Sequence, residues 1–222
     1  MPRIVALLPM KEHSERVANK NIRLFHGRPL YHHVLSSLLA CPYINAVYID
    51  TDSLFIMEDA PRHFDVHIIE RPEHLRSDLT PMNEILLYDV TQVEADYYVQ
   101  THSTNPLLRS QTITAAIEAF LASPEHDSLF SVTRLQRRLW DAKGRALNHN
   151  PSQLLRTQDL PPVYEENSNL YIFSKPILEE RCNRIGYQPL MFEIDRIEAW
   201  DIDDEQDFRI AEILHAERER SS

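Results

Sequence analysis

Basic side chains cluster directly after the first apolar run of the chain. Within residues 9–21 (PMKEHSERVANKN) stand three cations, Lys11, Arg16 and Lys20. Such head groups can neutralise a triphosphate, and hydrogen bonds from Ser14, Asn21 and backbone N–H groups can add to that binding. The alternative is a solvated loop with ordinary surface charge. The position after a predicted strand favours a phosphate site.

Two aspartates near the C-terminus could hold a metal ion. The segment 200–208 reads WDIDDEQDF, so Asp201 and Asp203 alternate around Ile202. In an extended segment both carboxylates point to one side. Two hard oxygen ligands suit Mg²⁺, which completes its shell with water and substrate phosphate. The alternative is that the acids from Asp203 onward cap the last predicted helix.

A third acidic motif, Asp50-Thr51-Asp52, ends another predicted strand. A DxD triplet there could bind a metal and nucleotide, as in glycosyltransferases of the GT-A type. The sequence favours the alternative, a strand end followed by a helix cap at Asp52 or Ser53. Zinc-ligand spacing among the histidines and a GxSxG nucleophile motif are both absent from the sequence.

Composition excludes several function classes. The chain of 222 residues has only three glycines, against roughly fifteen at average usage, so glycine-rich phosphate loops are excluded. A formal net charge of −11 disfavours nucleic-acid binding. The sequence contains no apolar run of membrane-spanning length, and two distant cysteines suit a reducing compartment. We therefore expect a cytoplasmic protein that contacts neither nucleic acid nor membrane.

The hydrophobic pattern predicts an α/β fold. Five strand-like runs alternate with four segments of helical periodicity; the strands are expected at 4–8, 46–51, 66–70, 96–101 and 128–133, and the helices at about 30–39, 53–64, 82–93 and 110–122. Right-handed crossovers make this a Rossmann-like three-layer αβα domain with a mostly parallel sheet. Ligands of such sheets bind beyond the carboxyl ends of the strands.

The alternation stops at about residues 135–169, a segment rich in Arg, Asn, Gln and Pro. It is too long for an ordinary connection, so we expect an insertion that serves as a lid or a dimerisation arm. Regular structure resumes with strands at 170–174 and 191–194, a helix after Pro176 and a last helix at about 205–217. We expect residues 1–222 to form a single domain.

Five blocks together resemble one family, the cytidylyltransferases that activate acidic sugars, namely acylneuraminate (CMP-sialic acid) synthetases and their relatives. In order, the blocks are Asn19-Lys20-Asn21-Ile22; Gly27-Arg28-Pro29-Leu30; Arg71-Pro72 with Leu75 and Ser77-Asp78; Arg156 with Gln158-Asp159-Leu160-Pro161 and residues 164–167; and Asp201-Ile202-Asp203. Each block is weak alone, and their joint order carries the resemblance.

The resemblance implies that CTP and an acidic acceptor give a CMP-linked product and pyrophosphate, with Mg²⁺ as cofactor. By the same resemblance, triphosphate and nucleotide contacts fall to Lys11, Ser14, Lys20, Asn21, Arg71 and Ser77, and the metal ligands are Asp201 and Asp203. Lys11 stands where the family has an arginine. Arg16 stands where relatives commonly have a glycine, and it would join Lys11 and Lys20 in stabilising the departing pyrophosphate.

The acceptor side departs from the sialic-acid pattern. Glu165 and Glu166 stand close to the position where a cation would meet the sugar carboxylate, and His102 replaces a glutamine, unless Gln100 takes that place. Acceptor contacts are expected from His102, Gln100, Arg156, Gln158, Tyr164 and Asn167. A different acid could use Arg137, Arg138 or Arg156. The family also suggests a homodimer; the alternatives are a GT-A glycosyltransferase or a silent nucleotide-binding homologue.

Overall fold

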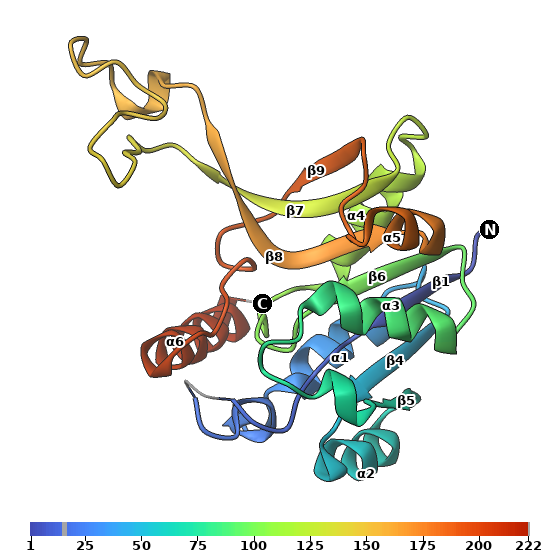
Figure 1. Cartoon of the computed structure of the whole chain (residues 1–222). Helices are drawn as coiled ribbons and strands as arrows, with labels where there is room; N and C mark the ends of the chain where they lie inside the picture. Colours follow the sequence, from blue (N-terminus) through green and yellow to red (C-terminus); the bar gives the residue numbers. More distant parts are fainter. Residues whose placement is uncertain (15–16, 222) are drawn as a thin grey trace.

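A seven-stranded sheet runs through the described part of the molecule, residues 1–14 and 17–221 of a computed structural model (Figure 1). The strand order is β5 (His67–Glu70), β4 (Ala46–Thr51), β1 (Ile4–Leu7), β6 (Tyr97–Thr101), β8 (Val163–Phe173), β7 (Ser128–Leu135) and β9 (Pro189–Glu193). Parallel pairing joins β5, β4, β1 and β6, and also β7 and β9. Only β8 is antiparallel to its neighbours. The mostly parallel sheet is confirmed.

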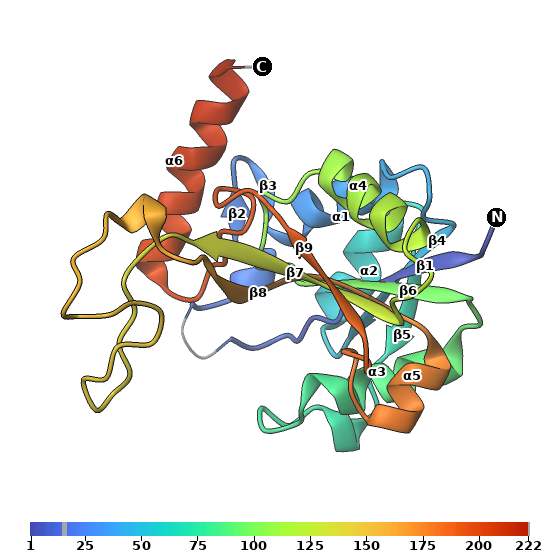
Figure 2. The same cartoon turned by 90° about the horizontal axis from the view of Figure 1, so that it is seen from above.

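Helices cover both faces of this sheet (Figure 2). One face carries α1 (Tyr31–Leu39), α2 (Leu54–His63) and α4 (Ser110–Leu121). The other face carries α3 (Met82–Gln92) and α5 (Lys175–Arg181), and α6 (Glu205–Ser221) packs on a smaller cluster with Phe25 and Leu30. A short hairpin joins β2 (Leu24–Phe25) to β3 (Arg28–Pro29), and 3₁₀ turns occupy Lys20–Ile22, Glu73–Leu75 and Thr157–Asp159. The three-layer αβα architecture is confirmed.

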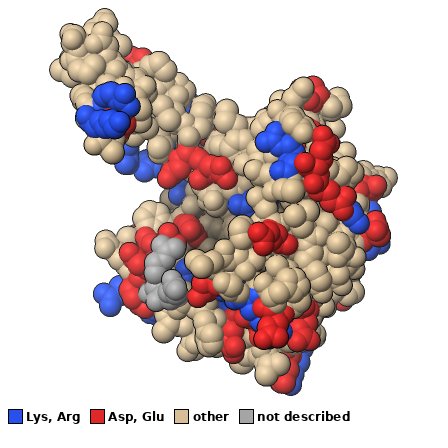
Figure 3. All heavy atoms as spheres, in the orientation of Figure 1, with Lys and Arg blue, Asp and Glu red and all other residues tan. Residues whose placement is uncertain are grey.

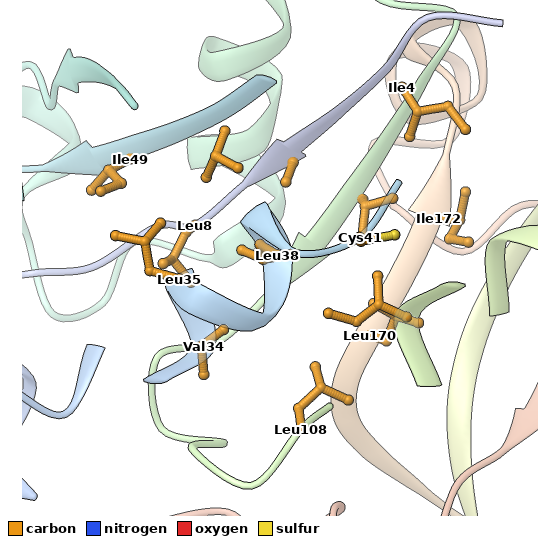
Figure 4. Close-up of a cluster of buried hydrophobic side chains, with 14 of the residues drawn as sticks. Ile4, Leu8, Val34, Leu35, Leu38, Cys41, Ile49, Leu108, Leu170 and Ile172 are labelled. Carbon is orange, nitrogen blue, oxygen red and sulfur yellow. The ribbon is translucent and has the colours of Figure 1, made fainter. Parts of the chain in front are cut away.

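The central strand β1 shows why its sequence is apolar throughout. Ile4 and Ala6 pack with α1 and α4 in the core shown in Figure 4. Val5 and Leu7 point to the opposite face and pack with α3. A strand buried on both faces cannot alternate between apolar and polar residues.

The insertion predicted at about residues 135–169 is shorter than expected. Strand β8 begins at Val163 and pairs with β7, so residues 163–169 belong to the sheet. These residues join the sheet because β7 and β8 form a long antiparallel hairpin, whose register shifts between Phe130 and Val132. Its connection, residues 136–162, which we call the arm, projects away from the body of the molecule (Figures 1 and 2).

Gly186 is a glycine that packing requires. A Cβ at this position would overlap the Asp127 carboxylate. That carboxylate accepts hydrogen bonds from the backbone N–H groups of Tyr187 (2.7 Å) and Gln188 (3.1 Å), which hold the loop entering β9. The missing side chain therefore lets the loop close onto Asp127.

Gly186→Ala is expected to lower the free energy of unfolding by about 1–3 kcal/mol, because the added methyl displaces the Asp127 carboxylate. Urea denaturation measures this. In an Asp127→Ala background the same substitution is expected to cost less, since the overlapping carboxylate is gone. Equal costs in the two backgrounds would show that the close approach to Asp127 is not the constraint.

Candidate active site

A cavity of about 370 Å³ lies at the carboxyl ends of β1, β5 and β6. All six residues predicted to contact nucleotide line it, together with His102 from the acceptor set: Lys11, Ser14, Lys20, Asn21, Arg71, Ser77 and His102. Segments distant in sequence therefore meet where the topology of a parallel sheet predicts. Arg16, also predicted to belong here, lies outside the described residues.

Two side chains fix the loop after β1. Asn21 donates from Nδ2 to the Lys11 carbonyl (2.8 Å), and its Oδ1 accepts from the Ser103 hydroxyl (2.7 Å). Lys11 forms an ion pair with Asp78, while its side chain stays 39% exposed. The loop is thus tied to the end of β6, and the Lys11 ammonium remains accessible to a ligand.

Arg71 lines the cavity, and its guanidinium is held by Asp50, one of two buried aspartates. It donates from Nε to Asp50, and the two side chains are only 3% and 1% exposed. Asp50 also faces Asp89, which is completely buried on α3. Burial, and then the charge of Asp50, raises the pKa of Asp89 well above its usual range, which favours a protonated Asp89 carboxyl in this apolar position.

The same contacts argue against a metal site at Asp50 and Asp52. Asp50 is occupied by Arg71, and Asp52 accepts a hydrogen bond from the Glu12 N–H (2.7 Å). Ser53 stands at the N-cap position of α2, as the favoured alternative predicts, although its side chain makes no capping hydrogen bond.

A second cavity, of about 470 Å³, contains Asp201 and Asp203. Lys20, which lines the first cavity, donates from Nζ to the carbonyl of Ile202 (2.6 Å). The Ile202 N–H donates to the carbonyl of Thr104 (3.0 Å), and Thr104 also lines the first cavity. The two cavities therefore adjoin along Lys20 and Thr104. Figure 3 shows a hollow on this face, with acidic side chains along its rim.

Asp201 and Asp203 fit a hard divalent cation. Both line the second cavity while Ile202 between them is fully buried, as the alternation predicts. Burial raises the pKa of Asp201, the Asp203 charge adds to this, and a hydrogen bond from Thr104 and the Lys20 charge oppose it. Asp201 is partly buried and Asp203 is exposed, and a cation would relieve the repulsion between their two charges. Among described residues, no cluster of three potential ligand side chains occurs, so water and phosphate would complete the shell.

Helix capping falls to the neighbouring acids. Asp204 accepts from the backbone N–H groups of Gln206 (2.8 Å) and Asp207 (2.9 Å), and Asp207 accepts from those of Asp203 and Asp204 (both 3.1 Å). This reciprocal pattern satisfies the start of α6 without the side chains of Asp201 and Asp203.

The structure brings together only part of the predicted acceptor set. Asn167 lines the second cavity and bonds Ser131 and Thr133. Gln100 is fully buried behind His102 and does not line the first cavity. The remaining three lie along the arm and its base: Arg156 pairs with Asp159, Gln158 lines a separate cavity, and Tyr164 opposes Arg134 on β7.

Two arginines near these cavities could not be identified from the sequence. Arg184, in the loop after α5, donates to Gln100 and lies over the Tyr171 ring. Arg196, in the loop after β9, lines the second cavity together with Arg137, Glu165 and Glu166. Neither stands in a recognisable motif, and only the folded topology brings them to the site.

Comparison with known proteins decides the family. Residues 5–219 match the family described as cytidylyltransferase. The chain belongs to the cytidylyltransferase family. This cytidylyltransferase is 24% identical over 229 residues to a post-translational flagellin modification protein B of Campylobacter coli, covering 98% of this chain and 97% of that protein. It is 27% identical to a CMP-N,N'-diacetyllegionaminic acid synthase of Legionella pneumophila, covering 81% and 82% of the two chains.

A solved structure supports the fold. A CMP:2-keto-3-deoxy-manno-octonic acid synthetase in complex with CTP superposes with a TM-score of 0.72 at 16% identity, covering 97% of this chain and 99% of that one. At this identity the likeness concerns the fold alone.

In the described part of the cytidylyltransferase, none of the helices is long and apolar enough to cross a membrane.

The buried proton on Asp89 predicts how stability changes with pH. The folded protein holds a proton that the unfolded chain releases above its pKa near 3.8, so the free energy of unfolding falls as pH rises. Asp89→Asn replaces the buried carboxyl group by a neutral amide of similar size. The variant therefore lacks this dependence of the free energy of unfolding on pH. Its stability relative to wild type is expected to grow as pH rises above pH ~4, by at most about 1.4 kcal/mol per pH unit for one proton, until the folded pKa of Asp89 is reached.

Denaturation at pH 4 to 8 measures the difference. Asn in place of the exposed Asp65 serves as the control and is expected to leave the slope unchanged. Parallel stability profiles for wild type and Asp89→Asn would contradict a proton held at Asp89.

Proposed function

We propose that this protein transfers CMP from CTP to a nonulosonic acid and releases pyrophosphate. The observation that carries the proposal is the pair of adjoining cavities, one lined by cations and the other by carboxylates, joined by the Lys20 contact to Ile202. Family membership and a relative that is a CMP-legionaminic acid synthase support the same reaction and acceptor class.

The first cavity supplies the features that a nucleotide needs. Lys11 and Lys20 would neutralise the triphosphate, and Arg71 would donate hydrogen bonds from a guanidinium that Asp50 holds in place. Ser14, Asn21 and Ser77 add polar contacts around the same space. Arg16 remains a predicted contributor from outside the described residues.

The reaction needs positioning and charge neutralisation rather than a covalent intermediate. An acceptor hydroxyl oxygen would form a bond to the α-phosphorus as the bond to the bridging oxygen of pyrophosphate breaks, and the hydroxyl proton would pass to solvent water. Lys20 lies between the two cavities, where it would stabilise charge on the leaving pyrophosphate.

We also propose Mg²⁺ as the cofactor, held by Asp201 and Asp203. When bound, it would supply positive charge beside the phosphates and the acceptor. The carboxylates themselves are placed by Ile202, whose burial and two backbone hydrogen bonds fix the direction of both side chains.

A homodimer is a further part of the proposal. The arm exposes large apolar side chains, with Trp140 52%, Leu147 63% and Leu154 88% exposed. A partner surface would remove them from water, and it would explain why Arg156 and Gln158 lie on the arm and not in this chain's own cavities. A monomer in light scattering at micromolar concentration would contradict this.

The cytoplasmic location stays a prediction.

The function is tested by incubating the protein with CTP, Mg²⁺ and one of three acids: N,N'-diacetyllegionaminic, N-acetylneuraminic or 2-keto-3-deoxy-manno-octonic acid. Pyrophosphate release is expected with a nonulosonic acid and not without acceptor. The altered charges around Glu165 predict weak use of N-acetylneuraminic acid. CTP binding by calorimetry without turnover of any acid would instead favour the silent homologue.

Asp201→Asn and Asp203→Asn are each expected to lower kcat by at least a hundredfold, because a carboxylate that holds the metal is lost. Asp204→Asn makes the same chemical change one residue away and keeps a good N-cap, so its kcat is expected to stay within about twofold. Metal-dependent turnover that survives both substitutions would place the metal elsewhere.

A further inference from the structure

A chain of three polar side chains ends at the first cavity. Arg184 donates from its guanidinium to Oε1 of Gln100, and Nε2 of Gln100 lies 3.2 Å from Nε2 of His102. Gln100 is completely buried, whereas His102 lines the cavity. The first two side chains thus lie behind the third, and their hydrogen bonds control which ring nitrogen of His102 carries its proton.

The orientation of the Gln100 amide is set from two sides. An arginine can only donate, so the Gln100 atom that faces Arg184 is the oxygen. The carbonyl of Thr101 can only accept, so the atom 2.8 Å from it is the Gln100 nitrogen. Both constraints require the same orientation of the amide.

That orientation determines the tautomer of His102. Because Gln100 presents an N–H to Nε2 of the ring, Nε2 must be the accepting nitrogen, and the proton of a neutral ring resides on Nδ1. Burial and the Arg184 charge lower the pKa of His102 to about 3, which agrees with a neutral ring. The ring therefore has one N–H available for a ligand.

Arg184 itself is held by contacts other than an ion pair. Its guanidinium lies 3.5 Å from the centre of the Tyr171 ring, and its backbone N–H donates to Asn83 (3.2 Å). No carboxylate of the described residues lies in ion-pair contact with it; Glu166 is hydrogen-bonded to the Tyr171 hydroxyl instead. The Arg184 charge also acts on His102 and lowers its pKa.

We propose that Arg184 and Gln100 hold His102 as a neutral hydrogen-bond donor, and that its Nδ1–H binds an oxygen of the acceptor acid. This rests on the proposed function. The acceptor is favoured over the nucleotide because Thr104, two residues beyond His102, accepts a hydrogen bond from the N–H of Ile202 (3.0 Å), which lies between Asp201 and Asp203, and so marks the side of the cavity nearest the carboxylates. His102 is then a specificity-determining residue, and Gln100 and Arg184 are positioning residues.

In this arrangement His102 does not act as a general base. With Nε2 already accepting a hydrogen bond and Nδ1 protonated, the ring has no free lone pair to take the acceptor's proton. Arg184 is the charged group that shifts its pKa, while Tyr171 and Glu166 on β8 act on Arg184. Among the residues that the structure describes, the other ionisable groups lining the cavity are Lys11, His13, Lys20, Arg71 and Asp78.

Nitrogen-15 NMR of histidine-labelled protein tests the tautomer without any substrate. His102 is expected to carry its proton on Nδ1 and not to titrate between pH 5 and 8. Arg184→Met is expected to raise the pKa of His102 toward the ordinary range, and Arg184→Lys, which restores a cationic donor, to lower it again. A wild-type His102 protonated on Nε2, or one that titrates near pH 6, would overturn the proposal even if the variants failed to fold.

Steady-state kinetics tests whether His102 contacts the acceptor or CTP. The measurement uses a nonulosonic acid that the protein turns over. His102→Ala is expected to raise the KM for the acceptor roughly three- to tenfold, with kcat and the KM for CTP within about twofold. His102→Gln, which restores a side-chain N–H, is expected to recover most of the loss. A rise in the KM for CTP alone would overturn the assignment to the acceptor. Absence of turnover with every acid would count against the proposed function and leave the NMR test intact.

Discussion

The site depends on one buried ammonium group. Lys20 is 9% exposed and donates to the carbonyl of Ile202, across 182 residues of sequence. Burying a cation is costly unless hydrogen bonds and charges compensate it, so this contact fixes the loop after β1 against the segment before α6. The same contact places a positive charge between the cation-lined cavity and the two carboxylates. Nucleotide and acceptor groups can therefore meet at one place.

Most of the fold could be predicted because its signals are local. The apolar run of β1 and the helical spacing of α1 and α4 each report burial of a segment against its neighbours. The position of β8 could not be predicted, since a strand that inserts between β6 and β7 is chosen by long-range pairing. Its first residues, 163–169, alternate too weakly to be distinguished from the arm that precedes them.

The candidate site likewise has one half that could be predicted from the sequence and one half that could not. Residues of the nucleotide half belong to blocks whose order could be recognised, and the fold places them in one cavity. The acceptor half depends on residues that carry no pattern, since Arg184 and Arg196 stand in loops. Behind the nucleotide half, Asp89 stands on a helix as an apparently ordinary acid. Their roles follow from burial and from hydrogen-bond partners, which a sequence does not contain. Sequence alone therefore predicted the reaction better than it predicted the acceptor contacts.

The most direct test of the central claim is a crystal structure of the protein with CTP and Mg²⁺. Electron density for the triphosphate is expected against Lys11 and Lys20, with the metal between the phosphates and the carboxylates of Asp201 and Asp203. A triphosphate bound away from Lys20, or a metal held at Asp50 and Asp52, would contradict it.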